Sequence, residues 1–110
     1  MIARHWKGIA KPGCAEDYVR HLKANVFPEL AGIPGFVRAT ILSRSVPTGT
    51  EFQIVTHWTS LDAIKGFAGA NVETAVVAPV VQELMVGYDA TVVHYEVEDV
   101  FEPRAADRPR

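Results

Sequence analysis

Hydrophobic and polar residues alternate along four segments of the chain, and between these segments apolar residues recur every three or four positions. Alternation is typical of half-buried strands, and the longer spacing is typical of amphipathic helices. The alternating segments are residues 2–9, 36–46, 51–58 and 90–98, and the helical spacing occurs in residues 15–26, 61–68 and 79–86. The sequence therefore predicts the order strand, helix, strand, strand, helices, strand.

Proline, glycine and capping residues mark the expected ends of the helices. Pro28 should stop or restart the first helix, because proline has no backbone N–H to donate. Thr59, with an acidic residue three positions later, resembles a capping box, and Gly69 should close the helix that follows. Asn71 can cap another short helix through residue 78, and Pro79 fits the first position of a further turn.

This order of elements is the split βαβ arrangement of ferredoxin-like α+β domains, with an antiparallel four-stranded sheet. Residues 1–98 should form that domain, and the polar, proline-containing residues 99–110 should form a tail. The helices can cover only one face of the sheet, yet each strand carries apolar residues in both registers. We therefore predict a homodimer in which a second copy covers the other face; the alternative is that the tail folds over it.

The composition narrows the classes of partner. The chain has 110 residues and a net charge of −2, and its lysine and arginine residues are scattered, so nucleic acid is not an expected partner. No stretch approaches the ~18 apolar residues that span a bilayer, and no signal peptide pattern is visible, so we expect no membrane partner. The single cysteine, Cys14, cannot form an internal disulfide, which agrees with a cytoplasmic protein.

No motif in the sequence brings its own chemistry. The histidines are His5, His21, His57 and His94, and no two have the spacing that local metal ligands use. A glycine-rich phosphate loop, a nucleophile elbow and a dinucleotide fingerprint are all missing. The sequence therefore predicts no metal and no cofactor, and any reaction would depend on the shape of a cavity.

The parity of the strands predicts where that cavity lies. If the large aromatic residues of segment 51–58 face the helices, the same face carries alternate residues of the first and last strands. Strand residues then meet helix residues around one pocket. The strands provide Arg4, Trp6, Thr56, Trp58 and His94, and the helices provide an apolar wall that includes Tyr18, Leu22 and Phe67.

Each polar or aromatic member of this set has a structural and a functional interpretation. Arg4 either pairs with Glu96 or holds an acidic or carbonyl-bearing ligand, because a half-buried guanidinium needs a partner. His94 is either a hydrogen-bonded structural histidine or a proton acceptor. Trp6 and Trp58 either fill the core or stack against a ligand.

The assembled residues resemble those of the antibiotic biosynthesis monooxygenase family. The likeness is found in the opening residues 1–8, in the segment 33–36, in the segment 57–69 from His57 to Gly69, and in the closing residues 93–97. The resemblance implies a ferredoxin-like domain that pairs into a dimeric α/β barrel. It also implies one of two activities, namely cofactor-independent oxygenation of aromatic polyketides or degradation of haem.

Several positions depart from the pattern that the resemblance implies. The polyketide oxygenases place an asparagine four residues before the tryptophan that ends the third strand; Trp58 matches this tryptophan, but Ile54 replaces the asparagine. The three positions that haem degraders use are occupied here by Trp6, Phe67 and Val77, which disfavours haem degradation.

Two functions remain open from the sequence. The first is a cofactor-independent monooxygenase acting on a small phenolic or quinone-like substrate, with Arg4 stabilising oxyanion charge and His94 accepting a proton. The second is a non-catalytic dimer, of the stress-associated kind or otherwise, that shelters a small ligand in the same pocket.

Overall fold

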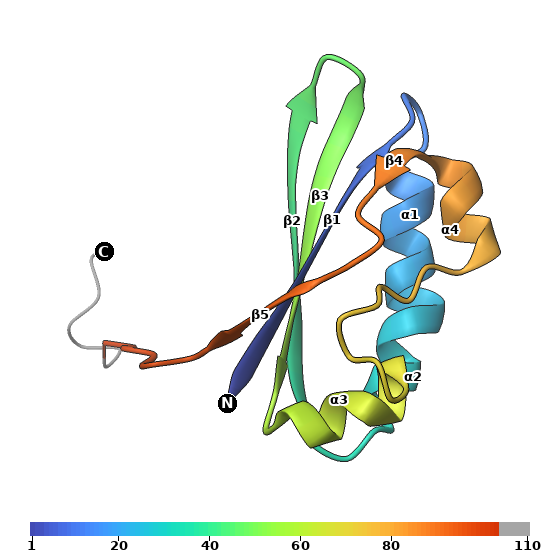
Figure 1. Ribbon diagram of the computed structural model, residues 1–110. Coiled ribbons are helices and arrows are strands. Elements are labelled where there is room, and N and C mark those ends of the chain that lie inside the picture. Colours follow the sequence, from blue (N-terminus) through green and yellow to red (C-terminus); the bar gives the residue numbers. More distant parts are fainter. Residues whose placement is uncertain (104–110) are drawn as a thin grey trace.

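A computed structural model describes residues 1–103, and it has the α+β architecture that the sequence predicts. A sheet lies on one side and the helices pack together on the other (Figure 1). The elements in chain order are β1 (Ile2–Ala10), α1 (Ala15–His21), the π-helical turn η1 (Leu22–Val26), α2 (Phe27–Ala31), β2 (Phe36–Val46), β3 (Gly49–Trp58), α3 (Leu61–Ala68), α4 (Pro79–Leu84), β4 (Met85–Tyr88) and β5 (Val93–Glu96).

The sheet is antiparallel and has five strands, which corrects the predicted four. Strands β2, β3 and β1 lie side by side, and β4 and β5 pair with opposite ends of β1. Within the predicted last strand, residues 90–98, only β5 (Val93–Glu96) forms, and β4 (Met85–Tyr88) begins where the helical spacing of residues 79–86 predicts the end of a helix. The backbone between them turns toward the loop before α4, where Val92 donates to the carbonyl of Glu73 and Ala75 donates to that of Ala90. These hydrogen bonds replace pairing with β1 over residues 90–92, whereas the N–H of Asp89 still donates to the carbonyl of Lys7.

The first helical region consists of three consecutive segments, α1, η1 and α2, and the last of these extends past Pro28. The N–H of Phe27 donates to the carbonyl of Leu22, five residues earlier, which is the π-helical pattern. Proline cannot donate the next bond of a regular α-helix, so the ladder is interrupted at this point. Of the two predicted outcomes at Pro28, a stop or a restart of the helix, the structure shows the restart.

Two details of the middle region differ from the prediction. Ser60, and not Thr59, caps α3, because its hydroxyl accepts from the N–H of Ala63 at 3.1 Å. No helix forms over residues 71–78; instead, the Asn71 side chain accepts from the N–H of Glu73 in a turn. This segment is rich in β-branched residues, which disfavour a helix. Gly69 ends α3 with a φ of 80°, as expected.

The core lies on the helix side of the sheet and forms two clusters. One surrounds Tyr18 and Phe52, and the other surrounds Trp58 and Ile64. Arg4 and Thr56 are the buried polar residues of the described chain, and they are register partners on β1 and β3. Since Ile2 pairs with Trp58 and Trp6 pairs with Ile54, the polar pair stands between the two clusters.

The opposite face of the sheet, here called the open face, carries no helix (Figure 1). Leu42, Val93 and Tyr95 lie on it and are 50%, 53% and 56% exposed. Charged residues, among them Arg38 and Arg44, interrupt this apolar surface. The open face is therefore more mixed than the alternation predicts.

Within residues 1–103, no helix is long and apolar enough to cross a membrane. The tail begins inside the described part of the chain, and residues 104–110 lie outside it.

Candidate functional site

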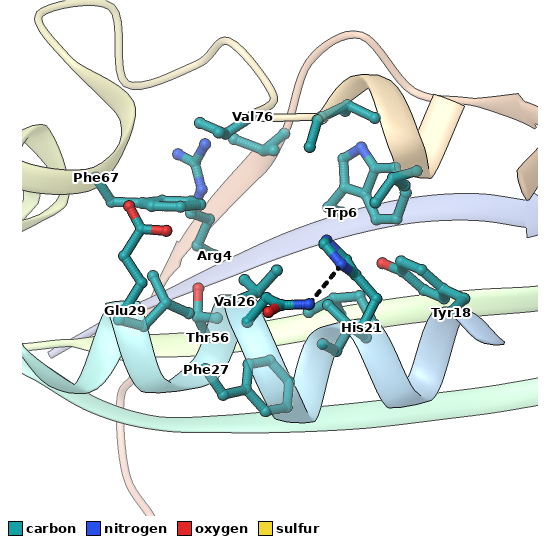
Figure 2. Close-up of a pocket in the computed structure, with 18 residues that line it drawn as sticks. Arg4, Trp6, Tyr18, His21, Val26, Phe27, Glu29, Thr56, Phe67 and Val76 are labelled. Atoms are coloured by element: carbon teal, nitrogen blue, oxygen red, sulfur yellow. Dashed lines mark hydrogen bonds between the residues drawn. The ribbon is translucent and has the colours of Figure 1, made fainter. Parts of the chain in front are cut away.

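A cavity of about 250 Å³ lies between the sheet and the helices, and we call it the helix-side cavity. Its floor is formed by β1 and β3, one wall by α1, η1 and α2, and its cover by the loop of residues 69–78 and the start of α4. Figure 2 shows the lining side chains pointing into this space. Of the residues predicted from the sequence, it is lined by Arg4, Trp6, Thr56, Tyr18, Leu22 and Phe67.

Arg4 is only 3% exposed and is held by the loop that covers the cavity. Its Nη1 donates to the carbonyl of Val72, and its Nη2 donates to the carbonyl of Thr74 at 2.9 Å. The guanidinium also lies 5.9 Å from the ring centre of Phe67. Burial lowers the pKa of Arg4 to about 10, so the group remains charged at neutral pH. Pairing with Glu96, one of the two alternatives that the sequence leaves open for Arg4, does not occur among the ion pairs of the described residues.

His94 lies next to Arg4 and does not line the helix-side cavity. Its Nε2 is 3.0 Å from Nη1 of Arg4. A guanidinium can only donate, so Nε2 accepts and the neutral ring carries its proton on Nδ1. Burial and the nearby charge of Arg4 lower the pKa of His94, which keeps the ring neutral. The role of proton acceptor remains a prediction, but in this arrangement the Nε2 lone pair is already occupied by Arg4.

Trp58 is fully buried and belongs to the core rather than to the cavity surface. Its indole Nε1 donates to the hydroxyl of Thr56 at 2.9 Å. Its ring stacks on that of Phe67, with centroids 6.3 Å apart and planes 21° from parallel. Trp58 therefore supports Thr56 and Phe67, and these two residues reach the cavity.

Trp6 lies across the other end of the cavity. Its Nε1 donates to the carbonyl of Asp89 at 2.9 Å, and its ring centre is 6.3 Å from that of Tyr18. The indole folds back over Gly8, where an added Cβ would stand 2.6 Å from Cη2 of Trp6. Gly8 thus provides the room that the indole occupies.

His21 and Asn25 belong to the site, although no sequence pattern predicted them there. Both line the cavity, and Nδ2 of Asn25 is 3.1 Å from Nδ1 of His21. The Nε2 atom of His21 is buried and has no hydrogen-bond partner among the described residues. The helical spacing could have indicated this, because His21 follows Tyr18 by three residues and shares its face.

No group of three or more potential metal ligands occurs in residues 1–103. The site is instead an apolar space with Arg4 and Thr56 toward one end and Trp6, Tyr18 and His21 toward the other (Figure 2). Such a space can hold a flat aromatic molecule and offer it hydrogen bonds at its edges.

Comparisons with known proteins agree with this fold. The family model described as Antibiotic biosynthesis monooxygenase matches residues 1–77. A comparison with curated proteins finds no match.

Three solved structures illustrate the likeness. SnoaB, a cofactor-independent oxygenase from Streptomyces nogalater, is 17% identical with a TM-score of 0.62, covering 93% of this chain and 97% of that one. The ActVA-Orf6 monooxygenase of Streptomyces coelicolor, in complex with nanaomycin D, is 18% identical with a TM-score of 0.61, covering 94% and 92%. The heme-degrader MhuD of Mycobacterium tuberculosis, with two hemes bound, is 20% identical with a TM-score of 0.60, covering 93% and 100%. At such identities the likeness shows a shared fold.

Proposed function

Because the chain belongs to the antibiotic biosynthesis monooxygenase family, we propose that it is a cofactor-independent monooxygenase acting on a small phenolic or quinone-like aromatic substrate. SnoaB is an oxygenase that needs no cofactor, and the ActVA-Orf6 structure holds nanaomycin D; both facts support the proposal. The observation in this chain that carries it is the apolar helix-side cavity with the buried cation of Arg4 at its edge.

The reaction balances without a cofactor for an anthrone-type substrate, in which a CH₂ group lies between two aromatic rings opposite a ketone. Loss of one proton to a water molecule gives a delocalised anion that is electron-rich enough to reduce O₂ directly, and the peroxide anion formed in the next step takes a proton back. A C–O bond then forms to give a peroxide, and loss of water leaves a second ketone. One oxygen atom enters the product and the other leaves as water, and the substrate provides all four electrons.

Arg4 is suited to stabilise the negative charge that develops on the substrate oxygen. A guanidinium has five N–H donors. Three are used by Val72, Thr74 and His94, so two remain. A fixed positive charge in an apolar cavity stabilises an oxyanion more strongly than it would in bulk water. We propose His94 as a positioning residue that orients Arg4.

The size of the cavity argues against haem as the ligand. About 250 Å³ is just below the roughly 300–1,000 Å³ of typical small-molecule sites, and a tetrapyrrole needs far more room than two or three fused rings. All three positions that haem degraders use, here Trp6, Phe67 and Val77, line the cavity, and Phe67 packs against Arg4. MhuD holds two hemes, whereas the helix-side cavity of this chain has a volume of about 250 Å³.

A non-catalytic ligand-binding protein is the second candidate, and one observation favours it. His94, the predicted base, does not line the cavity and has its Nε2 engaged by Arg4. A chain that binds the substrate analogue but consumes no oxygen would fit this alternative.

We further propose that the protein works as a homodimer through its open face. Leu42 on β2 and Val93 and Tyr95 on β5 lie at least half exposed on this face. A second copy would cover these apolar residues.

The test of the enzymatic proposal is oxygen uptake with dithranol, a dihydroxyanthrone. We expect one O₂ consumed per molecule of quinone formed, and one ¹⁸O atom in the product when ¹⁸O₂ is used. Arg4→Ala and His94→Ala should slow uptake by tenfold or more. Glu83→Gln, which changes an exposed residue of α4, is the matched control and should leave the rate unchanged.

Two outcomes would count against the assignment. Unchanged rates in both variants would remove the roles of Arg4 and His94. Binding of the analogue 1,8-dihydroxyanthraquinone without oxygen uptake from any anthrone would support the non-catalytic candidate instead.

A further inference from the structure

We propose that Tyr18 and His21 form a hydrogen-bonding pair that holds an oxygen atom of the aromatic ligand at the Trp6 end of the helix-side cavity. The inference rests on the proposed function, because it states how the same cavity would orient its substrate. It assigns a binding role to His21 of α1, which lies toward the opposite end of the cavity from Arg4.

His21 has a polar atom without a partner. The Asn25 amide nitrogen can only donate, so Nδ1 of His21 accepts and the neutral ring carries its proton on Nε2. That Nε2 is buried and has no partner among residues 1–103, so a ligand oxygen can reach it only after a small rotation of the imidazole. A single hydrogen bond to Asn25 leaves the imidazole free to turn slightly toward a ligand.

Tyr18 places a second polar group at the same position. The residue is 2% exposed, and its hydroxyl has no hydrogen bond to another described side chain or backbone group. Burial raises the pKa of Tyr18, so the phenol stays protonated and can donate at every physiological pH. Its ring is fixed between Trp6 and Phe52 by edge and tilted contacts.

The two donors lie next to each other on one helix face, because they are three residues apart. Figure 2 shows the Tyr18 hydroxyl and the His21 imidazole close together below Trp6. The π-helical turn begins directly after His21, and such turns occur often at functional sites. An unsatisfied buried polar atom such as Nε2 of His21 destabilises the protein, and a ligand oxygen that accepts from it would remove that cost.

The position of the pair restricts the class of ligand. Arg4 and Trp6 are two residues apart on β1, which separates the two ends of the cavity by roughly 7 Å. A ligand with one oxygen at Tyr18 and His21 and another facing Arg4 therefore carries oxygens on opposite edges of a planar ring system. Quinones, hydroquinones and hydroxyanthrones have this arrangement.

The experiment compares the affinities of 1-naphthol and naphthalene, measured under nitrogen by quenching of tryptophan fluorescence. The naphthol oxygen should make wild-type protein bind 1-naphthol more tightly than naphthalene. Tyr18→Phe and His21→Leu should each lower this preference by about three- to tenfold, the range expected for one hydrogen bond. His21→Gln, which keeps a donor, should restore part of it.

Thermal unfolding provides the structural control. Tyr18→Phe removes an unpartnered hydroxyl without changing the ring, so its Tm should equal or exceed that of the wild type. The Nε2–H proton of His21 should also shift in NMR spectra when 1-naphthol is added, and not when naphthalene is added.

The outcomes separate this inference from the proposed function. A preference for 1-naphthol that is unchanged in both variants, or no binding of either compound, overturns the inference even if the protein consumes oxygen. A preference that collapses in both variants supports the inference even if no anthrone is oxidised.

Discussion

At the scale of single residues, Arg4 shows how one side chain connects several parts of the fold. It lies on β1, binds two carbonyls of the covering loop and contacts His94 on β5. The sequence indicates that Arg4 is half-buried and needs a partner, but it favours no partner beyond Glu96 or a ligand. Backbone carbonyls cannot be identified as partners from side-chain patterns, because every residue has one.

Gly8 provides the first prediction at this scale. We expect Gly8→Ala to displace the Trp6 indole, because the new Cβ would stand 2.6 Å from Cη2. The cost in the free energy of unfolding should be about 1–3 kcal/mol, as for other overpacked sites, and the tryptophan emission should shift. Urea unfolding followed by fluorescence measures both.

Gly87→Ala is the matched control for this substitution. Gly87 also lies in the sheet, but a Cβ there would have nothing within 4 Å. Equal destabilisation by the two substitutions would show that Gly8 does not make room for Trp6.

His94 leads to a prediction about pH. Its pKa is lowered in the folded protein by burial and by Arg4, so the unfolded chain binds a proton near pH 6.5 before the folded protein does. Stability should therefore be fully present above about pH 6.5 and decrease as the pH falls through the lowered folded pKa. Urea unfolding at pH 7.5 and pH 5.5 measures the difference.

His94→Gln should reduce this pH dependence while keeping an acceptor for Arg4. Part of the dependence should persist, because burial, Arg38 and His5 also lower the pKa of His57. An identical pH dependence in the wild type and in His94→Gln would contradict the assignment to His94.

At the scale of the elements, long periodic segments are predicted well and their capping and connecting residues less well. Strand β2 matches the predicted 36–46, and α4 begins at Pro79 as expected. The helix expected after Asn71 is absent, because the loop's backbone pairs with residues 90–92, which are distant in sequence. A local pattern cannot show such pairing.

The site residues also divide into those that the strand pattern predicts and those that depend on contacts between distant segments. Parity places Arg4, Trp6 and Thr56 correctly at the cavity, since it depends only on the register of β1 and β3. It places Trp58 on the right face, but it cannot show that Phe67 covers the indole. It also overlooks His21, because that residue's position depends on how α1 turns against the sheet.

The cap of α3 can be tested directly. Ser60→Ala removes the hydroxyl that accepts from Ala63, and it should lower the free energy of unfolding by about 1 kcal/mol. Thr59→Ala should cost clearly less, because Thr59 does not cap the helix. If Thr59→Ala destabilises the protein more than Ser60→Ala in urea unfolding, Thr59 would be the cap, as the sequence suggested.

At the scale of the whole molecule, the sheet has one face covered by helices and one open face (Figure 1). The proposed homodimer should have about twice the chain mass of 12.1 kDa in size-exclusion chromatography with light scattering. Leu42→Arg should shift it toward a monomer, because it buries a charge in the interface.

Val80→Arg is the control for that substitution. Val80 is 48% exposed on α4, compared with 50% for Leu42 on the open face. Val80→Arg should leave the molecular mass measured by light scattering unchanged. A wild-type protein that elutes as a monomer would remove the proposed dimer.

The central position of β1 has a consequence for how the chain is made. The N-terminal strand is synthesised first, yet Ile2 pairs with Trp58 and Glu96. At synthesis rates of about 5–20 residues per second, the strand waits roughly 5–20 s for its last partner to leave the ribosome. Folding should then be slow for a domain of this size, because its sheet closes through contacts between distant parts of the chain. Until β4 and β5 are synthesised, one edge of β1 is unpaired, and a chaperone that shields this edge should raise the yield of folded protein.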